Sequence, residues 1–313
     1  MYLKLVLAAC FLAFCAGVFS AYARLSDAGL GCANWPACYE ENALKEKQLS
    51  QADASRNHSS WKWRLQNITG MILGMLSIAI CSIAWQKRRE LRQSPLLPTM
   101  LLALIAFLGA FGIWAFSHLP RSVIVPVHLA GGSAMLILLT WIALHQIKYS
   151  EISAGVILRW SRFSRLAFVM VLAQTLQGAW LSSNFAALAC TDLPLCNGLL
   201  LPAMDFSFSL ERYGPPLSVE QLVSIHWIHR VGALLVLLYL GWLSIMMMAV
   251  EGLRAIGKTL LGLLAFQFVL GISSVALGLP LAIAVLHNAT AMLLLVVLTV
   301  LNFRLRIGEK KKI

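Results

Sequence analysis

The chain alternates long apolar stretches with shorter polar connections. Each apolar stretch approaches the roughly 20 residues that a helix needs to cross the hydrocarbon core of a bilayer. The pattern predicts an all-α membrane protein with eight transmembrane helices. These helices are expected near residues 3–22, 65–85, 97–117, 125–145, 163–182, 222–248, 259–279 and 281–303.

Composition agrees with this pattern. Of 313 residues, 59% are hydrophobic and only 12% are charged, and the mean hydropathy is +0.78. These values exclude an ordinary soluble globule and indicate a multi-pass protein in a lipid bilayer.

Basic residues set the predicted orientation. The net charge of +12 comes largely from alternate connections and the C-terminal tail, so we predict that both termini face the cytoplasm from the inner membrane. These side chains would meet anionic headgroups. No groove of interleaved basic and aromatic residues suggests a nucleic-acid partner.

The helix pattern occurs twice. Residues 1–150 and 151–313 each contain four predicted helices and one long outer loop, which indicates two parallel four-helix units related by an axis along the membrane normal. The first stretch, ending at Ala21–Ala23, also resembles a signal peptide. Retention of this helix is favoured, because cleavage would remove one of the four helices of a repeat unit.

A cysteine motif also occurs twice, once in each outer loop. The motifs are CANWPAC at 32–38 and CTDLPLC at 190–196. Disulfides persist on the oxidising side of the membrane, so we predict the pairs Cys32–Cys38 and Cys190–Cys196. They could be structural staples or redox-active bonds. Zinc is less favoured, because its ligands usually occur as closer pairs.

Three histidines lie inside predicted spans, where a polar ring should face the bundle interior and have a partner. His128 and His287 occupy equivalent places in the two units, 159 positions apart. His229 has a similar depth to His287, so these two imidazoles could approach one plane from opposite sides, as in a b-type haem site. The alternative is that all three histidines only bridge helices by hydrogen bonds.

Residues beside these histidines fit a haem pocket. Arg230 could pair with a haem propionate or extend towards headgroups. Small residues, among them Gly131, Gly132 and Gly232, would allow a flat macrocycle to approach the backbone, although they also suit helix packing.

The chain resembles the haem A synthases over nearly its whole length. The residues that carry the resemblance are RLSDAGLGCANWPACYE (24–40), VHLAGG (127–132), QGAWLSSNFAALACTDLPLCNG (177–198), HWIHRVGAL (226–234) and LGISSVALGLPLAIAVLHNATAMLLL (270–295). The resemblance implies a second unit that holds haem b, and a first unit that binds haem O and oxidises one ring methyl to a formyl group.

Residue roles follow from the resemblance. It implies that His229 and His287 are the haem b ligands, that His128 is a ligand on the substrate side, and that the two cysteine loops cover the haem pockets. It also implies an enzyme that supplies haem O and an electron donor whose identity the sequence does not give. A homo-oligomer is left open.

One segment departs from the family. Helix II of the family carries a glutamate, two residues and a His-Arg pair, where this chain has Trp63, Gln66 and Asn67. An amide is a poor iron ligand and an indole accepts no proton. No catalytic residue is therefore assigned. Three functions stay open: a haem A synthase-like oxidoreductase, a haem b electron-transfer protein without that oxidation, and an assembly factor with a structural haem.

Overall fold

The computed structural model describes residues 1–27, 61–150, 152–207 and 217–307, and in these segments the chain is helical without a strand ladder. Eight long helices and one 3₁₀ turn are present there. They are α1 (Tyr2–Asp27), α3 (Trp61–Gln86), α4 (Leu96–His118), α5 (Arg121–His145), α6 (Ala154–Ser183), α7 (Val219–Met248), α8 (Arg254–Ala276) and α9 (Leu281–Ile307), with η2 (Ala186–Leu188) after α6.

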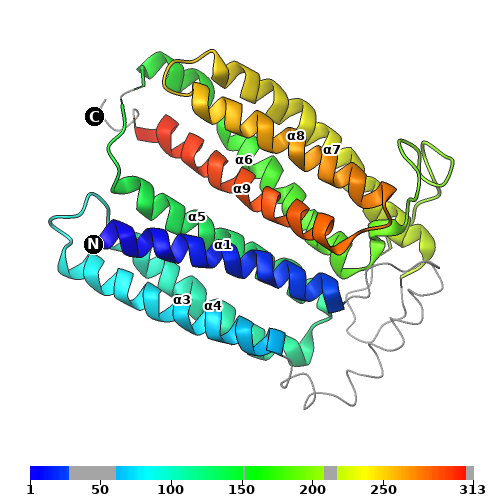
Figure 1. Ribbon diagram of the computed structural model, residues 1–313, viewed down its shortest axis with the longest axis horizontal. Helices are drawn as coiled ribbons and strands as arrows, with labels where there is room; N and C mark the ends of the chain where they lie inside the picture. Colours follow the sequence, from blue (N-terminus) through cyan, green and yellow to red (C-terminus); the bar gives the residue numbers. More distant parts are fainter. Residues whose placement is uncertain (28–60, 151, 208–216, 308–313) are drawn as a thin grey trace.

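The predicted all-α membrane fold is confirmed. Within the described segments, seven of these helices are long and apolar enough to span a bilayer. The exception is α6, which carries Arg159, Arg162 and Arg165 in its first half and Gln174 and Gln177 further along. It is 30 residues long and runs beside its neighbours through the depth of the bundle (Figure 1).

The helices pack as two bundles of four. Contacts follow the ring α1–α3–α4–α5 in the first bundle and α6–α7–α8–α9 in the second, while α1 and α5 also touch α9 and α5 touches α6. Figure 1 shows the two groups side by side. In each ring the second and fourth helices, α3 with α5 and α7 with α9, lie diagonally opposite. The domain division at residue 150 stays a prediction.

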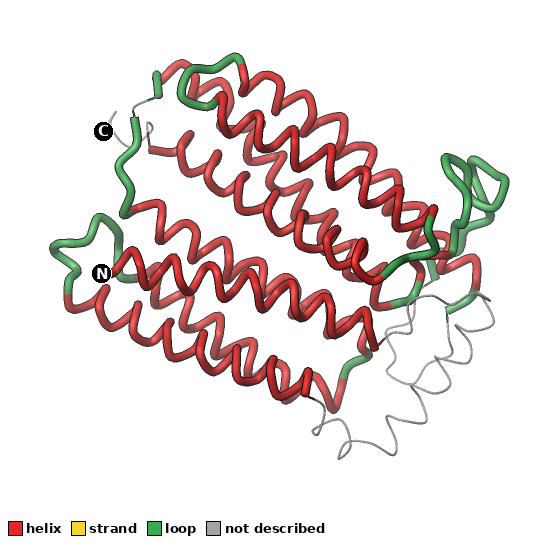
Figure 2. The backbone as a smooth tube through the Cα atoms, in the orientation of Figure 1, coloured by secondary structure: helices red, strands yellow, loops and turns green. Residues whose placement is uncertain are grey.

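The two ends of the bundle differ. The first helix begins and the last helix ends at one end, which we call the inner end, while the loop between α6 and α7 projects from the opposite, outer end (Figure 2). Each bundle has its own apolar core towards the inner end. The core of the first includes Ile80, Leu101, Leu139 and Ile142, and that of the second includes Leu240, Leu243, Met247, Leu260 and Leu298.

The outer end of the second bundle has a separate apolar cluster. Leu222, Val223 and Ile225 of α7 pack there with Leu181 of α6 and with the buried cysteines of the following loop. A capping box of Ser218 and Gln221 begins α7 just before these residues, and its side chains satisfy main-chain groups that the first turn leaves open. Between this cluster and the inner core lies the part of the bundle that holds the histidines.

Candidate functional site

The second bundle brings His229 and His287 together. They project from α7 and α9, the diagonal pair of the ring, and both rings are partly buried. The two imidazoles lie close enough to interact electrostatically. The sequence predicts that both residues lie at a similar depth in the membrane. The packing of the helices brings them to opposite sides of the interior of one bundle.

Two glutamines of α6 hold His229. The Oε1 atom of Gln177 lies 2.5 Å from Nδ1 of the imidazole, and the Nε2 atom of Gln177 donates to the carbonyl of Ile225 at 3.1 Å. Gln174 donates from Nε2 to the main-chain carbonyl of His229 at 2.9 Å, and the same nitrogen lies 3.1 Å from Nδ1 of the ring. Within the described segments the Nε2 atom of His229 makes no hydrogen bond, so it is open to a ligand.

His287 has a different environment. The Nε2 atoms of Gln267 and His287 lie 3.2 Å apart. Among the described residues, Nδ1 of His287 and Oε1 of Gln267 are buried without a hydrogen-bond partner. A buried polar atom without a partner is costly, and an imidazole nitrogen in that state suits coordination of a metal.

A glycine lies against each of the three intramembrane histidines. A Cβ atom added at Gly178 or Gly271 would lie 3.2 Å from Cε1 of His229 or His287, and one at Gly112 would lie 3.2 Å from Nε2 of His128. Sequence reasoning missed these glycines. A signal was present, because Gly112 and Gly271 each precede their histidine by 16 residues.

Two glycines that the sequence suggested for close approach of a macrocycle have other neighbours. The space beside Gly131 is filled by the side chain of Leu108, and that beside Gly232 by the amide oxygen of Gln174. These two glycines therefore make room for side chains of the adjoining helix. Of the three glycines named from the sequence, only Gly132 has open space within 4 Å of its added Cβ.

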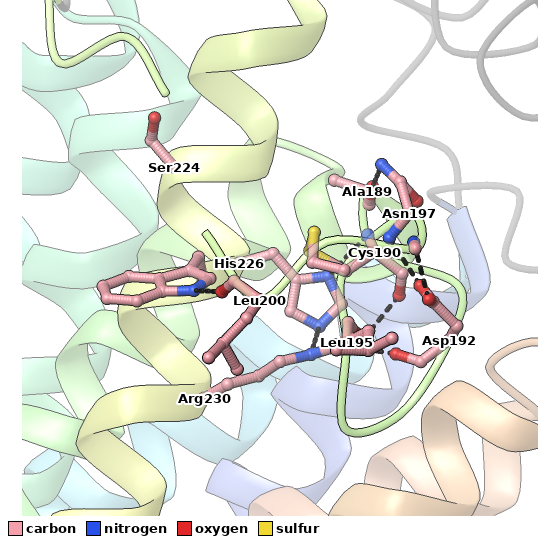
Figure 3. The surroundings of a disulfide bond; sticks show 12 residues. Ala189, Cys190, Asp192, Leu195, Asn197, Leu200, Ser224, His226 and Arg230 are labelled. Carbon is pink, nitrogen blue, oxygen red and sulfur yellow. Dashed lines mark hydrogen bonds between the residues drawn. A yellow bond between two sulfur atoms is a disulfide. The ribbon is translucent and has the colours of Figure 1, made fainter. Parts of the chain in front are cut away.

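Arg230 anchors the cysteine loop. Its Nη1 donates to the carbonyls of Asp192 at 2.8 Å and Leu195 at 2.7 Å, and its Nη2 donates to that of Cys190 at 2.7 Å. Its Nε donates to Nε2 of His226 at 3.1 Å, and His226 is only 3% exposed. Figure 3 shows this arrangement around the disulfide. Pairing of Arg230 with a haem propionate stays a prediction.

The predicted disulfide Cys190–Cys196 is present. Asp192 organises the turn inside its ring, because its carboxylate accepts from the main-chain nitrogens of Asn197 at 2.5 Å and Gly198 at 2.8 Å. Those hydrogen bonds, first of all the one from Gly198, hold the pKa of Asp192 below its usual value. The other predicted pair, Cys32–Cys38, lies outside the described residues.

The first bundle has fewer elements of such a site. His128 of α5 is exposed, and the centroid of its ring lies 5.8 Å from that of Phe111 of α4. On the diagonal helix α3, the side chains of Trp63, Gln66 and Asn67 are all exposed. The departure seen in the sequence therefore lies where a partner for His128 would be expected.

The glutamines of the second bundle also lack counterparts in the first. Gln174 and Gln177 precede Cys190 by 16 and 13 residues, and Ala16 and Phe19 precede Cys32 by the same intervals. Gln267 precedes His287 by 20 residues, as Leu108 precedes His128. Apolar side chains thus replace all three amides.

The donor set suits a haem iron better than a bare metal ion. Within the described segments no group of three or more His, Cys, Asp or Glu side chains is gathered. Two histidine nitrogens complete the coordination of an iron whose other ligands belong to a macrocycle. His229 offers an open Nε2 and His287 an unpartnered Nδ1, so the residues present fit such a group.

Known proteins resemble this chain over nearly its whole length. The family model described as cytochrome oxidase assembly protein (COX15-CtaA) matches residues 3–299. A relative named Heme A synthase from Shewanella oneidensis is 33% identical over 303 residues, which cover 91% of each chain. Another relative of that name, from Halalkalibacterium halodurans, is 26% identical and covers 92% of this chain and 90% of its own.

Proposed function

This chain belongs to the cytochrome oxidase assembly protein family, and we propose that it is a haem A synthase-like oxidoreductase. It would act in haem A biosynthesis by converting one ring methyl of haem O to a formyl group. The names of its relatives support this assignment. The structural observation that carries it is the pair of imidazoles, His229 and His287, on diagonal helices of one bundle.

In this proposal the second bundle binds haem b between His229 and His287. When bound, the haem would supply a one-electron carrier beside the substrate bundle. Gly178 and Gly271 let the two rings lie against the neighbouring helices. The outer cluster of Leu222, Val223 and Ile225 would exclude water from the outer side of the pocket, because the cysteine loop packs onto it.

The first bundle would take haem O as substrate, with His128 on its iron. Trp63, Gln66 and Asn67 offer neither a carboxylate nor an imidazole from α3. The reaction also needs an oxidant and electrons. An electron donor and a haem O-forming enzyme are therefore proposed partners.

A second candidate function has a specific observation in its favour. The replacements on α3 suggest a family member that binds haem b for electron transfer or oxidase assembly without oxidising haem O. In that case the first bundle would bind haem but would lack the residues needed to oxidise its ring methyl. The two functions share the His229–His287 site and differ only in the chemistry of the first bundle.

The proposed location is the inner membrane, with both termini in the cytoplasm. Arg159, Arg162 and Arg165 of α6 and Arg304 and Arg306 of α9 all lie towards the inner end. Excess Lys and Arg marks the cytoplasmic side of bacterial membrane proteins. The cysteine loop then faces the oxidising compartment, where its disulfide persists.

The deciding experiment is haem extraction from the purified protein. The chain is expressed with a haem O source in a host that lacks its own haem A synthase, and the haems are identified by chromatography and mass. Haem A or hydroxylated haem O supports the enzyme, with His128→Ala as the matched variant that loses the product. Only haem B, in a well-expressed and haem-loaded protein, would refute it in favour of the second candidate.

A further inference from the structure

The amide of Gln177 is oriented by two contacts. Its Nε2 donates to the carbonyl of Ile225 at 3.1 Å, which fixes the nitrogen end of the amide. The oxygen end then lies 2.5 Å from Nδ1 of His229. An amide oxygen only accepts hydrogen bonds, so with Gln177 as its partner Nδ1 of His229 carries the hydrogen and Nε2 carries the lone pair. The Nε2 atom of Gln174, which lies 3.1 Å from the same Nδ1, then donates to the His229 carbonyl and not to the ring.

The backbone of the same histidine is also held by α6. Gln174 donates to the carbonyl of His229 at 2.9 Å, and its amide oxygen packs into the space beside Gly232. Gly178 follows Gln177 directly and leaves room for Cε1 of the ring. Three residues of α6 therefore act on one histidine: Gln177 contacts the ring of His229, Gln174 holds its main chain, and Gly178 leaves room for the ring.

We propose that Gln177 is a positioning residue that fixes the tautomer of His229 and lowers the reduction potential of the haem that this histidine binds. The inference rests on the proposed haem b site of the second bundle. An acceptor on Nδ1–H raises the basicity of the opposite nitrogen. A more basic ligand stabilises ferric over ferrous iron, because it donates more electron density to the metal.

The arrangement is specific to one ligand of one bundle. Within the described segments, neither ring nitrogen of His287 meets a hydrogen-bond acceptor, because Nδ1 has no partner and Nε2 lies 3.2 Å from the amide nitrogen of Gln267. Phe19 stands at the position of the first bundle that corresponds to Gln177. His229 would thus be the stronger donor of the pair. Its hydrogen bond to Gln177 is the contact through which α6 sets the electron affinity of the second bundle.

Three variants on α6 test the proposal. Gln177→Leu removes the acceptor, Gln177→Glu replaces it with a stronger one, and Thr175→Val is the matched control. The Thr175 hydroxyl donates only to the carbonyl of Val171, at 2.8 Å on its own helix. Each protein is purified from the same host. Haem content, the reduced-minus-oxidised spectrum and the midpoint potential are then measured.

Gln177→Leu should retain a b-type spectrum but favour reduced haem about tenfold at a fixed ambient potential, which is a rise of about 59 mV for one electron. Gln177→Glu should shift the potential the other way, and Thr175→Val should not shift it. Loss of haem from Gln177→Leu with retention in Gln177→Glu would support the same role, because only the second variant keeps an acceptor.

The proposal is overturned if both Gln177 variants have the wild-type potential, or if both lose haem equally. A parallel His229→Ala protein separates this failure from that of the proposed function. Should His229→Ala keep the full wild-type spectrum, the haem b site itself is misplaced. Should it lose the spectrum while Gln177→Leu keeps the wild-type potential, only the role of Gln177 is refuted.

Discussion

The outer thirds of α3 and α7 occupy the same place in their bundles and have opposite environments. In α7, residues 222–226 are all buried, and His226 and Arg230 fasten the cysteine loop above them. In α3, none of residues 61–72 is buried. The inner halves show no such contrast, because both contain a buried apolar core.

This difference indicates that the four-helix scaffold can be kept while the histidine site within it changes. The two bundles share their helix order, and each keeps one glycine 16 residues before the histidine of its last helix. Among the residues that the structure describes, only the second bundle adds the opposing histidine and the amides that hold it. A four-helix unit of this kind is thus stabilised by its inner core, while its outer half is free to gain or lose a ligand set.

The largest expected effect comes from removing one histidine of the proposed haem b site and comparing the result with removal of the histidine of the first bundle. His229→Ala or His287→Ala should lower the b-type haem content by more than about tenfold, since even indirect partners of a metal ligand contribute about 10- to 100-fold. His128→Ala should leave that spectrum in place. Optical spectra of the purified proteins check this, and an equal loss in all three would contradict the assignment of separate sites.

The second prediction makes the first bundle more like the second. The triple change Trp63→Glu, Gln66→His and Asn67→Arg supplies a carboxylate, an imidazole and a guanidinium on the helix diagonal to His128. We expect the haem content per protein to rise, because two imidazoles can then hold one iron. Haem extraction against protein mass measures it. Trp63→Glu alone is the control, and unchanged haem content in the triple variant would show that α3 does not face His128.

A smaller effect is expected from the glycine beside His229. Gly178→Ala places a Cβ atom 3.2 Å from Cε1 of the ring, so the ring must shift, at a cost of about 1 kcal/mol. Gly262→Ala is the matched control on α8, because nothing lies within 4 Å of the added atom. Thermal unfolding and the haem spectrum report the change. Equal behaviour of the two variants would mean that Gly178 provides no clearance.

The smallest effect concerns the turn within the disulfide ring. The pKa of Asp192 is lowered in the folded protein. The hydrogen bonds of its carboxylate therefore stabilise the fold fully at pH values above the ordinary aspartate pKa of about 3.9. This stabilisation is lost as the pH falls through the lowered pKa of the folded state. Wild type should be more stable than Asp192→Asn at neutral pH, and the difference should vanish in acid. Unfolding midpoints across pH test this, and a constant difference would exclude the carboxylate as the cause.

Sequence alone determined the helices, the depth of the three histidines and the pairing of Cys190 with Cys196. Helix length in a bilayer depends on runs of apolar residues, and a disulfide across five residues is a local contact. These features follow from neighbours along the chain. The replacement of charged and imidazole side chains by Trp63, Gln66 and Asn67 is likewise a property of one short segment, so the sequence itself displays it.

Only the tertiary structure decided which side chains meet the histidines. Gln177 and His229 come from different helices, and their contact depends on how α6 and α7 rotate and slide against each other. The same holds for Arg230 with the cysteine loop, and for Gly232, which lies against Gln174 of α6. Contacts between helices are set by packing of whole surfaces, which local sequence patterns do not encode.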